Sequence, residues 1–117
     1  MQKKFLILVM FAVMTGITSM IFAEMIGNAG AGKILYEKNC ITCHGKDGKG
    51  DGMAAMSLKP KPTNFTEPTV TAKSDKELFD TITKGKQGTS MISFEKMMTE
   101  QQRWDVLAYI RSLGSKK

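Results

Sequence analysis

The chain has little of several residues on which other kinds of site and fold depend. It contains one histidine and only two cysteines among 117 residues. Both cysteines lie in one short segment, so a framework of several disulfides is excluded. No stretch of useful length alternates apolar with polar residues, which argues against a β-sheet. The formal net charge of +6 is moderate and dispersed, which argues against binding to a nucleic acid backbone.

Residues 1–23 have the pattern of a secretory signal peptide. Lys3 and Lys4 give it a positive start, an apolar run follows, and Ala23 supplies a small residue for cleavage. The apolar stretch is nearly long enough to span a bilayer, so an uncleaved membrane anchor is the alternative. In both cases we expect an exported protein, in the periplasm or on the outer side of the cytoplasmic membrane. Cleavage would leave about 94 residues, which suits one small domain.

The remaining sequence divides into a short connection and one domain. Small residues predict a flexible tether over residues 24–30, and the folded domain is expected over residues 31–117. Good helix formers with apolar residues on one side predict a first helix over residues 33–38, near the start of the domain. Glycines and prolines then punctuate residues 45–68, which predicts a long loop.

Two capping boxes mark the starts of further helices. Ser74 and Thr99 are each followed three residues later by Glu or Gln, and then by apolar residues at helical spacing. The first of these helices is expected to end near Lys84, and the second, which is strongly amphipathic, at Gly114. The sequence therefore predicts an all-α class with three or more helices and long connections.

Residues 40–44 read C-I-T-C-H, which is the attachment sequence of a c-type haem. The thiols of Cys40 and Cys43 can each form a thioether to one of the two vinyl groups of a porphyrin. His44 can then ligate the iron. Because His44 is the only histidine in the chain, the opposite face of the iron needs a ligand of another type.

Two other interpretations of this motif have less support. A redox-active dithiol normally follows a strand in a β-α-β setting, and no strand is predicted before Cys40. A zinc site formed by Cys40, Cys43 and His44 would need a carboxylate or water as its fourth ligand, because no further cysteine or histidine exists.

These elements, in this order, resemble the class I cytochrome c family, and in particular its small exported monohaem bacterial type. The resemblance rests on residues 32–37, 44–52 and 108–113, and it extends over essentially the whole mature chain. It implies a cytochrome c fold, in which helices and long loops wrap around one covalently bound haem. It also implies that the first and last helices cross closely at Gly32, where a glycine lets the two backbones approach.

The resemblance further implies a methionine as the second axial ligand. Outside the signal segment the candidates are Met25, Met53, Met56, Met91, Met97 and Met98. Met91 lies between the second and last predicted helices, where similar cytochromes carry this ligand, and Met56 is the main alternative. For the others, packing is the simpler interpretation. By the same resemblance, a backbone carbonyl at Pro60 or Pro62 is expected to orient His44.

Ligation by His44 and Met91 would fill both axial positions, which favours electron transfer over the activation of a small molecule. We therefore expect a single-electron carrier and not an enzyme, with no small-molecule substrate of its own. Its partners would be redox proteins with acidic docking patches. The lysines available to meet them are Lys46, Lys49, Lys84, Lys86 and Lys96. One alternative is a haem subunit or tethered module of a larger respiratory or periplasmic enzyme complex, and another is a ligand sensor or peroxidase-like enzyme with an open iron.

Overall fold

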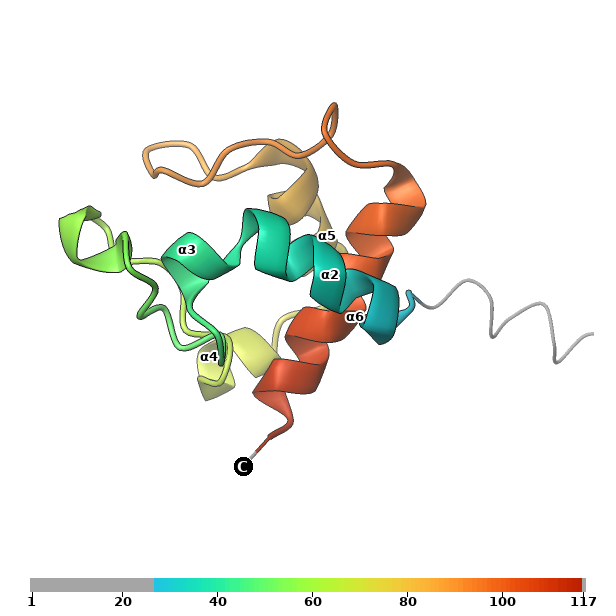
Figure 1. Cartoon of the computed structure of the whole chain (residues 1–117), viewed down its shortest axis with the longest axis horizontal. Helices are drawn as coiled ribbons and strands as arrows, with labels where there is room; N and C mark the ends of the chain where they lie inside the picture. The colour runs from blue at the N-terminus through green and yellow to red at the C-terminus, as the bar shows by residue number, and fades with distance from the viewer. Residues whose placement is uncertain (1–26, 117) are drawn as a thin grey trace, which may run out of the picture.

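The computed structural model describes residues 27–116, and the predicted signal peptide lies outside this range. The helices, in chain order, are α2 (Ala29–Asn39), α3 (Ile41–His44), the short 3-10 helix η1 (Ala55–Ser57), α4 (Pro68–Thr71), α5 (Asp75–Lys84) and α6 (Glu100–Gly114) (Figure 1). No strand occurs among the described residues. The predicted all-α class with long connections is thereby confirmed.

The first helix begins at Ala29, slightly earlier than predicted, because Asn28 caps it. The Asn28 side chain accepts a hydrogen bond from the backbone N–H of Ala31 at 3.0 Å. Its own backbone N–H donates to the carboxylate of Asp105 on α6 at 2.7 Å. The predicted tether is therefore corrected in its last part, since residues 27–30 belong to the folded unit. Its first part, residues 24–26, lies outside the described residues.

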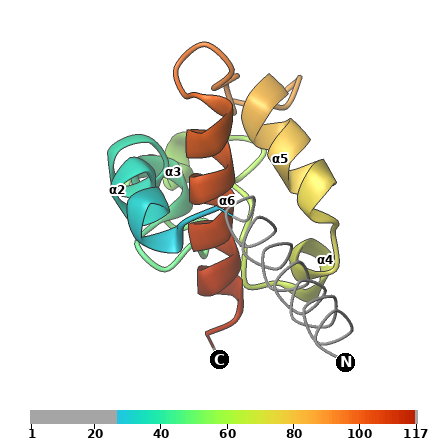
Figure 2. The ribbon, with the colours of Figure 1, turned by 90° about the vertical axis from the view of Figure 1, so that its right-hand side faces the viewer.

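Helix α2 crosses α6 at Gly32, as the resemblance implied. A Cβ atom at Gly32 would overlap the backbone carbonyl of Asp105, so only a glycine allows this approach. One turn further on, Tyr36 is completely buried and packs edge-on against Tyr109 of α6, with 5.1 Å between the ring centroids. Figure 2 shows α2 on one side of α6 and α5 on the other.

Both predicted capping boxes are present. Ser74 accepts a hydrogen bond from the N–H of Glu77, whose side chain accepts one from the N–H of Ser74, and Thr99 and Gln102 do the same at the start of α6. Gly85 ends α5 with a φ of 73°, a conformation that a residue with a Cβ atom rarely adopts. The predicted bounds of α5 and α6 are confirmed.

The core lies where α6 meets α2, α5 and the segment that precedes α6. Its buried members are Tyr36, Ile82, Phe94, Met98, Val106, Leu107, Ile110 and Leu113. Among residues 27–116, no helix is long and apolar enough to cross a membrane. The long connections do not fill the space beside this core completely, and a cavity lies there.

Candidate functional site

A cavity of about 480 Å³ lies against the core side of α6. Its size is within the range of about 300–1,000 Å³ that is usual for cofactor and ligand sites. The motif residues Cys40, Cys43 and His44 line it, together with parts of both long connections. The apolar lining is formed by Leu58, Pro60, Pro62, Phe65, Val70, Leu78, Ile82, Met91, Ile92, Phe94, Met98, Val106, Leu107 and Ile110.

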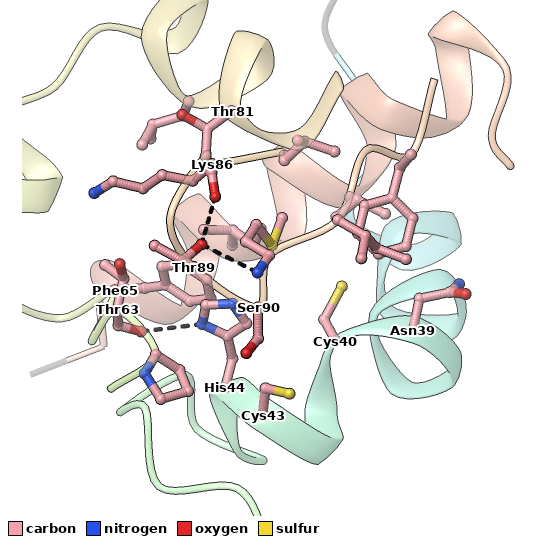
Figure 3. A pocket seen from close by; sticks show the side chains of 18 of the residues that line it. Asn39, Cys40, Cys43, His44, Thr63, Phe65, Thr81, Lys86, Thr89 and Ser90 are labelled. Atoms are coloured by element: carbon pink, nitrogen blue, oxygen red, sulfur yellow. Dashed lines mark hydrogen bonds between the residues drawn. The ribbon is translucent and has the colours of Figure 1, made fainter. Parts of the chain in front are cut away.

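The C-x-x-C-H motif forms the short helix α3, which brings its functional side chains to one wall. The N–H of Cys40 donates to the carbonyl of Tyr36 at 2.8 Å, so α3 is tied directly to the end of α2. The N–H of His44 donates to the carbonyl of Cys40 at 2.9 Å, which closes one helical turn. Cys40, Cys43 and His44 are consequently neighbours at the cavity (Figure 3), and both thiols are free.

The imidazole of His44 is held by a carbonyl and an aromatic ring. Its Nδ1 lies 3.1 Å from the carbonyl oxygen of Thr63, and its ring stacks on Phe65 with 4.4 Å between centroids and 19° between planes. Because a carbonyl oxygen only accepts, Nδ1 carries the proton, and the lone pair of Nε2 is left for a metal. Burial lowers the pKa of His44, although the Thr63 carbonyl opposes this, so the neutral imidazole that ligates iron is favoured.

The carbonyl that orients His44 is that of Thr63, which differs from the expectation from the resemblance. Neither Pro60 nor Pro62 supplies it, although both prolines line the cavity. The path of the chain explains the difference, because the N–H of Phe65 donates to the carbonyl of Gly48 at 2.7 Å. This bond fixes the register in which Thr63, the residue after Pro62, passes the imidazole.

The environment of the thiols argues against the two alternative interpretations of the motif. Burial raises the pKa of Cys40 to about 12, with a smaller contribution from Cys43. Redox-active dithiols depend on a lowered pKa, because the thiolate is the reacting form. Among residues 27–116, no three side chains of the His, Cys, Asp and Glu types are grouped in a way that would hold a metal ion, as zinc would require.

The cavity distinguishes among the candidate methionines. Met91 and Met98 line it, whereas Met53 and Met56 are 96% and 92% exposed and do not. The alternative ligand Met56 therefore does not fit the cavity. Met97 is also exposed, and Met25 lies outside the described residues. Met98 is buried in the core, whereas Met91 is partly buried and lies in the connection between α5 and α6.

Met91 belongs to residues 85–98, which we call the methionine loop. Hydrogen bonds close its first part into a compact turn: Lys86 N–H donates to the Met91 carbonyl at 3.1 Å, and Met91 N–H donates to Thr89 Oγ1 at 3.1 Å. The Thr89 hydroxyl in turn donates to the Lys86 carbonyl at 2.7 Å (Figure 3). Thr89 thus fixes the backbone at Met91, a role that sequence reasoning missed because a lone threonine in a loop has no distinctive pattern.

The aromatic residues divide between the cavity and the core. Phe65 and Phe94 line the cavity, but Phe79 does not. Its ring instead stacks on that of Trp104, with 4.1 Å between the ring centroids. Apart from His44, the ionisable side chains of the described lining are the two thiols and the three lysines Lys61, Lys73 and Lys86. No carboxylate of the described residues lines the cavity.

Two thiols and an oriented imidazole on one wall of an apolar cavity, within an all-α fold, define a protein suited to c-type haem. The sequence profile of the Cytochrome c family matches residues 29–114. The chain belongs to the cytochrome c family. Proteins of this family bind c-type haem covalently and transfer electrons, and the donor set described above fits that haem.

Two solved structures show the same fold. One belongs to the reducing HAO-like protein complex Kustc0457/Kustc0458 of Kuenenia stuttgartiensis, with 33% identity, a TM-score of 0.66, and coverage of 74% of this chain and 42% of that one. The other is the c-type cytochrome KustC0563, with 25% identity, a TM-score of 0.60, and coverage of 70% of this chain and 95% of that one. The chain thus spans less than half the length of the first neighbour. None of the curated proteins matches the chain.

Proposed function

We propose that the protein is a single-electron carrier with one covalently attached haem, ligated by His44 and Met91. The observation that carries the proposal is that His44, with its Nδ1 bonded to Thr63, and Met91 line the same apolar cavity. An imidazole and a thioether together complete the coordination of haem iron and leave no position for a substrate. Bound haem would supply a one-electron iron couple.

The residues that line the haem site would each have a defined part in this function. Cys40 and Cys43 would hold the haem through thioethers, formed by addition of their S–H groups across the vinyl double bonds, so that no leaving group is released. His44 donates its Nε2 lone pair, and the bond to Thr63 keeps the ring from rotating. Met91 would supply the second protein ligand of the iron. The apolar walls keep water away from the iron, which favours the less charged, reduced form.

The proposed partners are redox proteins with acidic docking patches, met outside the cytoplasm. Three lysines line the cavity and would lie beside the bound haem. One of them, Lys86, is also among the five lysines predicted to meet the partner. The other four, Lys46, Lys49, Lys84 and Lys96, are exposed. Complementary charge of this kind accelerates encounter more than it strengthens binding. We therefore expect fast, salt-sensitive exchange of electrons with an acidic partner.

The alternative is a haem subunit or tethered module of a larger respiratory or periplasmic enzyme complex. The neighbour from Kuenenia stuttgartiensis, which belongs to a multi-protein complex and is more than twice as long as the matched region, favours this possibility. Intact-mass measurement and gel filtration of the exported protein separate the two. A monomer that has lost residues 1–23 and carries one haem supports the shuttle, whereas a stable complex or a retained N-terminus supports the subunit.

Carbon monoxide binding to the reduced protein tests the axial ligands. We expect the wild type to resist carbon monoxide at neutral pH, and Met91→Ala to bind it rapidly and completely. Met56→Ala is the matched control, because it truncates an exposed methionine that does not line the cavity. Rapid, complete binding of carbon monoxide by the wild type would contradict ligation of the iron by two protein residues. If Met56→Ala bound carbon monoxide rapidly and Met91→Ala did not, Met56 would be the ligand.

A further inference from the structure

Arg103 on α6 is a buried cation that the proposed function does not yet use. It is only 9% exposed, and one guanidinium nitrogen, Nη1, donates to the backbone carbonyls of Met98 at 2.7 Å and Glu95 at 3.2 Å. Its Nε atom is buried and has no hydrogen-bond partner among the described residues. The guanidinium lies over the ring of Phe79, 5.4 Å from its centroid.

This arrangement is unusual because a buried charge normally has a carboxylate partner. The ion pairs found among residues 27–116 join other residues, and none includes Arg103. Taking a guanidinium out of water without a counter-ion is unfavourable, and an apolar side chain of similar size would pack there at less cost. The hydrogen bonds to two carbonyls and the contact with Phe79 offset only part of this cost. The fold therefore keeps a charge where stability alone does not require one.

Both carbonyls that Arg103 binds belong to the methionine loop. The loop is also bonded to α5: Phe94 N–H donates to the Ile82 carbonyl at 3.1 Å, and both Glu95 N–H and the Ser93 hydroxyl donate to the Thr83 carbonyl, at 3.2 Å and 2.6 Å. Arg103 adds hydrogen bonds from α6 to this loop, besides the packing of Phe94 and Met98 in the core. The side chains of the intervening residues 95–97 are exposed and contribute no such anchor.

Arg103 is also hydrogen-bonded to a residue of the cavity wall. Met98, whose carbonyl it binds, is buried and lines the cavity with Met91. In a water-poor interior a positive charge acts over a longer distance than it does at the surface. Such a charge stabilises an added electron more than it stabilises the oxidised state, and so it raises a reduction potential.

We propose that Arg103 is a positioning residue with two effects: it clamps the methionine loop to α6 so that Met91 stays at the cavity, and its charge raises the reduction potential of the bound haem. The proposal deepens the function argued above and rests on Met91 as a ligand. The clamp depends on the forked guanidinium, whereas the effect on potential depends only on the charge. Two substitutions can therefore separate them.

Arg103→Gln removes both the fork and the charge, and Arg103→Lys keeps the charge but replaces the fork with a point donor. Losing one buried hydrogen bond of ordinary strength changes an opening equilibrium by about tenfold. We expect both variants of the holoprotein to bind carbon monoxide at least about tenfold faster than the wild type, since the iron is exposed more often. The reduction potential should fall in Arg103→Gln and stay near the wild-type value in Arg103→Lys.

Arg111→Gln is the matched control. Arg111 also lies on α6 and also joins it to another segment, through hydrogen bonds to Asp75 and to the carbonyls of Thr71 and Lys73. That segment is not the methionine loop. We expect this variant to lose stability, while its carbon monoxide kinetics and reduction potential remain unchanged.

The outcomes distinguish this inference from the proposed function. If the wild type resists carbon monoxide and Arg103→Gln behaves like it in both measurements, the inference about Arg103 is wrong and the function stands. Equal effects in Arg111→Gln would show general loosening of α6 and would also overturn it. If the wild type itself binds carbon monoxide completely, Met91 is not a ligand, and the clamp fails together with the proposed ligation.

Discussion

Gly32→Ala should weaken the fold at the crossing of α2 and α6. An added Cβ would overlap the backbone carbonyl of Asp105 and lie 3.0 Å from the backbone nitrogen of Val106. Both obstacles are main-chain atoms of a helix, so no side-chain rotation can relieve the overlap and α2 must move away. This movement would also disturb Tyr36, which is fully buried one turn later.

The size of the effect follows from two opposing contributions. Overpacking of a tight contact costs about 1–3 kcal/mol, and backbone obstruction places this case near the upper end. Alanine returns about 0.5–1 kcal/mol because it is a better helix former than glycine. The expected net loss in the free energy of unfolding is about 2 kcal/mol, and for a domain of this size that lowers Tm by on the order of 10 °C.

Guanidinium unfolding of the holoproteins measures this loss, with Gly30→Ala as the control. Gly30 lies on the same helix but is exposed, and a Cβ there would meet only the Asn28 side chain at 3.2 Å. At this exposed position only the helix-propensity gain of about 0.5–1 kcal/mol applies, so Gly30→Ala should be at least as stable as the wild type. If the free energies of unfolding of Gly32→Ala and Gly30→Ala differed by less than about 0.5 kcal/mol, the α6 backbone would not obstruct a Cβ atom at Gly32.

Two further substitutions test the local interactions that frame the site. Tyr36→Phe removes the hydrogen bond that the buried hydroxyl donates to the Gly45 carbonyl at 2.6 Å, and at neutral pH it should destabilise the protein by about 1–3 kcal/mol. Burial, with smaller contributions led by Cys40, raises the pKa of Tyr36, so the wild type should lose stability as the pH rises above about 10, the pKa of tyrosine in the unfolded chain. Unfolding titrations should show this alkaline loss flattened in Tyr36→Phe, and an equally steep loss in both proteins would contradict the assignment. Ser74→Ala removes the N-cap of α5 and should cost about 1 kcal/mol, which thermal unfolding would detect, whereas a variant as stable as the wild type would show that this capping box contributes nothing.

The helices could be predicted because their signals are local. The capping boxes at Ser74 and Thr99, and the glycine that follows Lys84, act on residues within one turn of themselves, so the sequence around them is sufficient. The start of α2 is different, because Asn28 is held partly by Asp105, which is 77 residues away in the chain. A contact of that separation leaves no trace in the local sequence, so the small residues 27–30 alone predict a tether where the fold has the start of a helix.

The site, like the helices, could be predicted only where its residues are close together in the chain. Cys40, Cys43 and His44 are adjacent in the chain, and one helical turn is enough to bring them together. The carbonyl that orients His44 depends on how the loop after Gly48 returns, which the hydrogen bond from Phe65 to Gly48 decides. For the same reason the sequence could rank Met91 above Met56 only by resemblance, whereas the fold separates them by exposure.

The cavity and the hydrophobic core have several residues in common. Phe94, Met98, Val106, Leu107 and Ile110 are core residues that also line the cavity. A domain of this size buries only about 60–65% of the surface that its unfolded chain exposes, so a large apolar group held against these side chains would complete the core as well as the site. The four-residue helix α3 is too short to form alone. Attachment at Cys40 and Cys43 should therefore stabilise the fold and position the ligands through the same contacts.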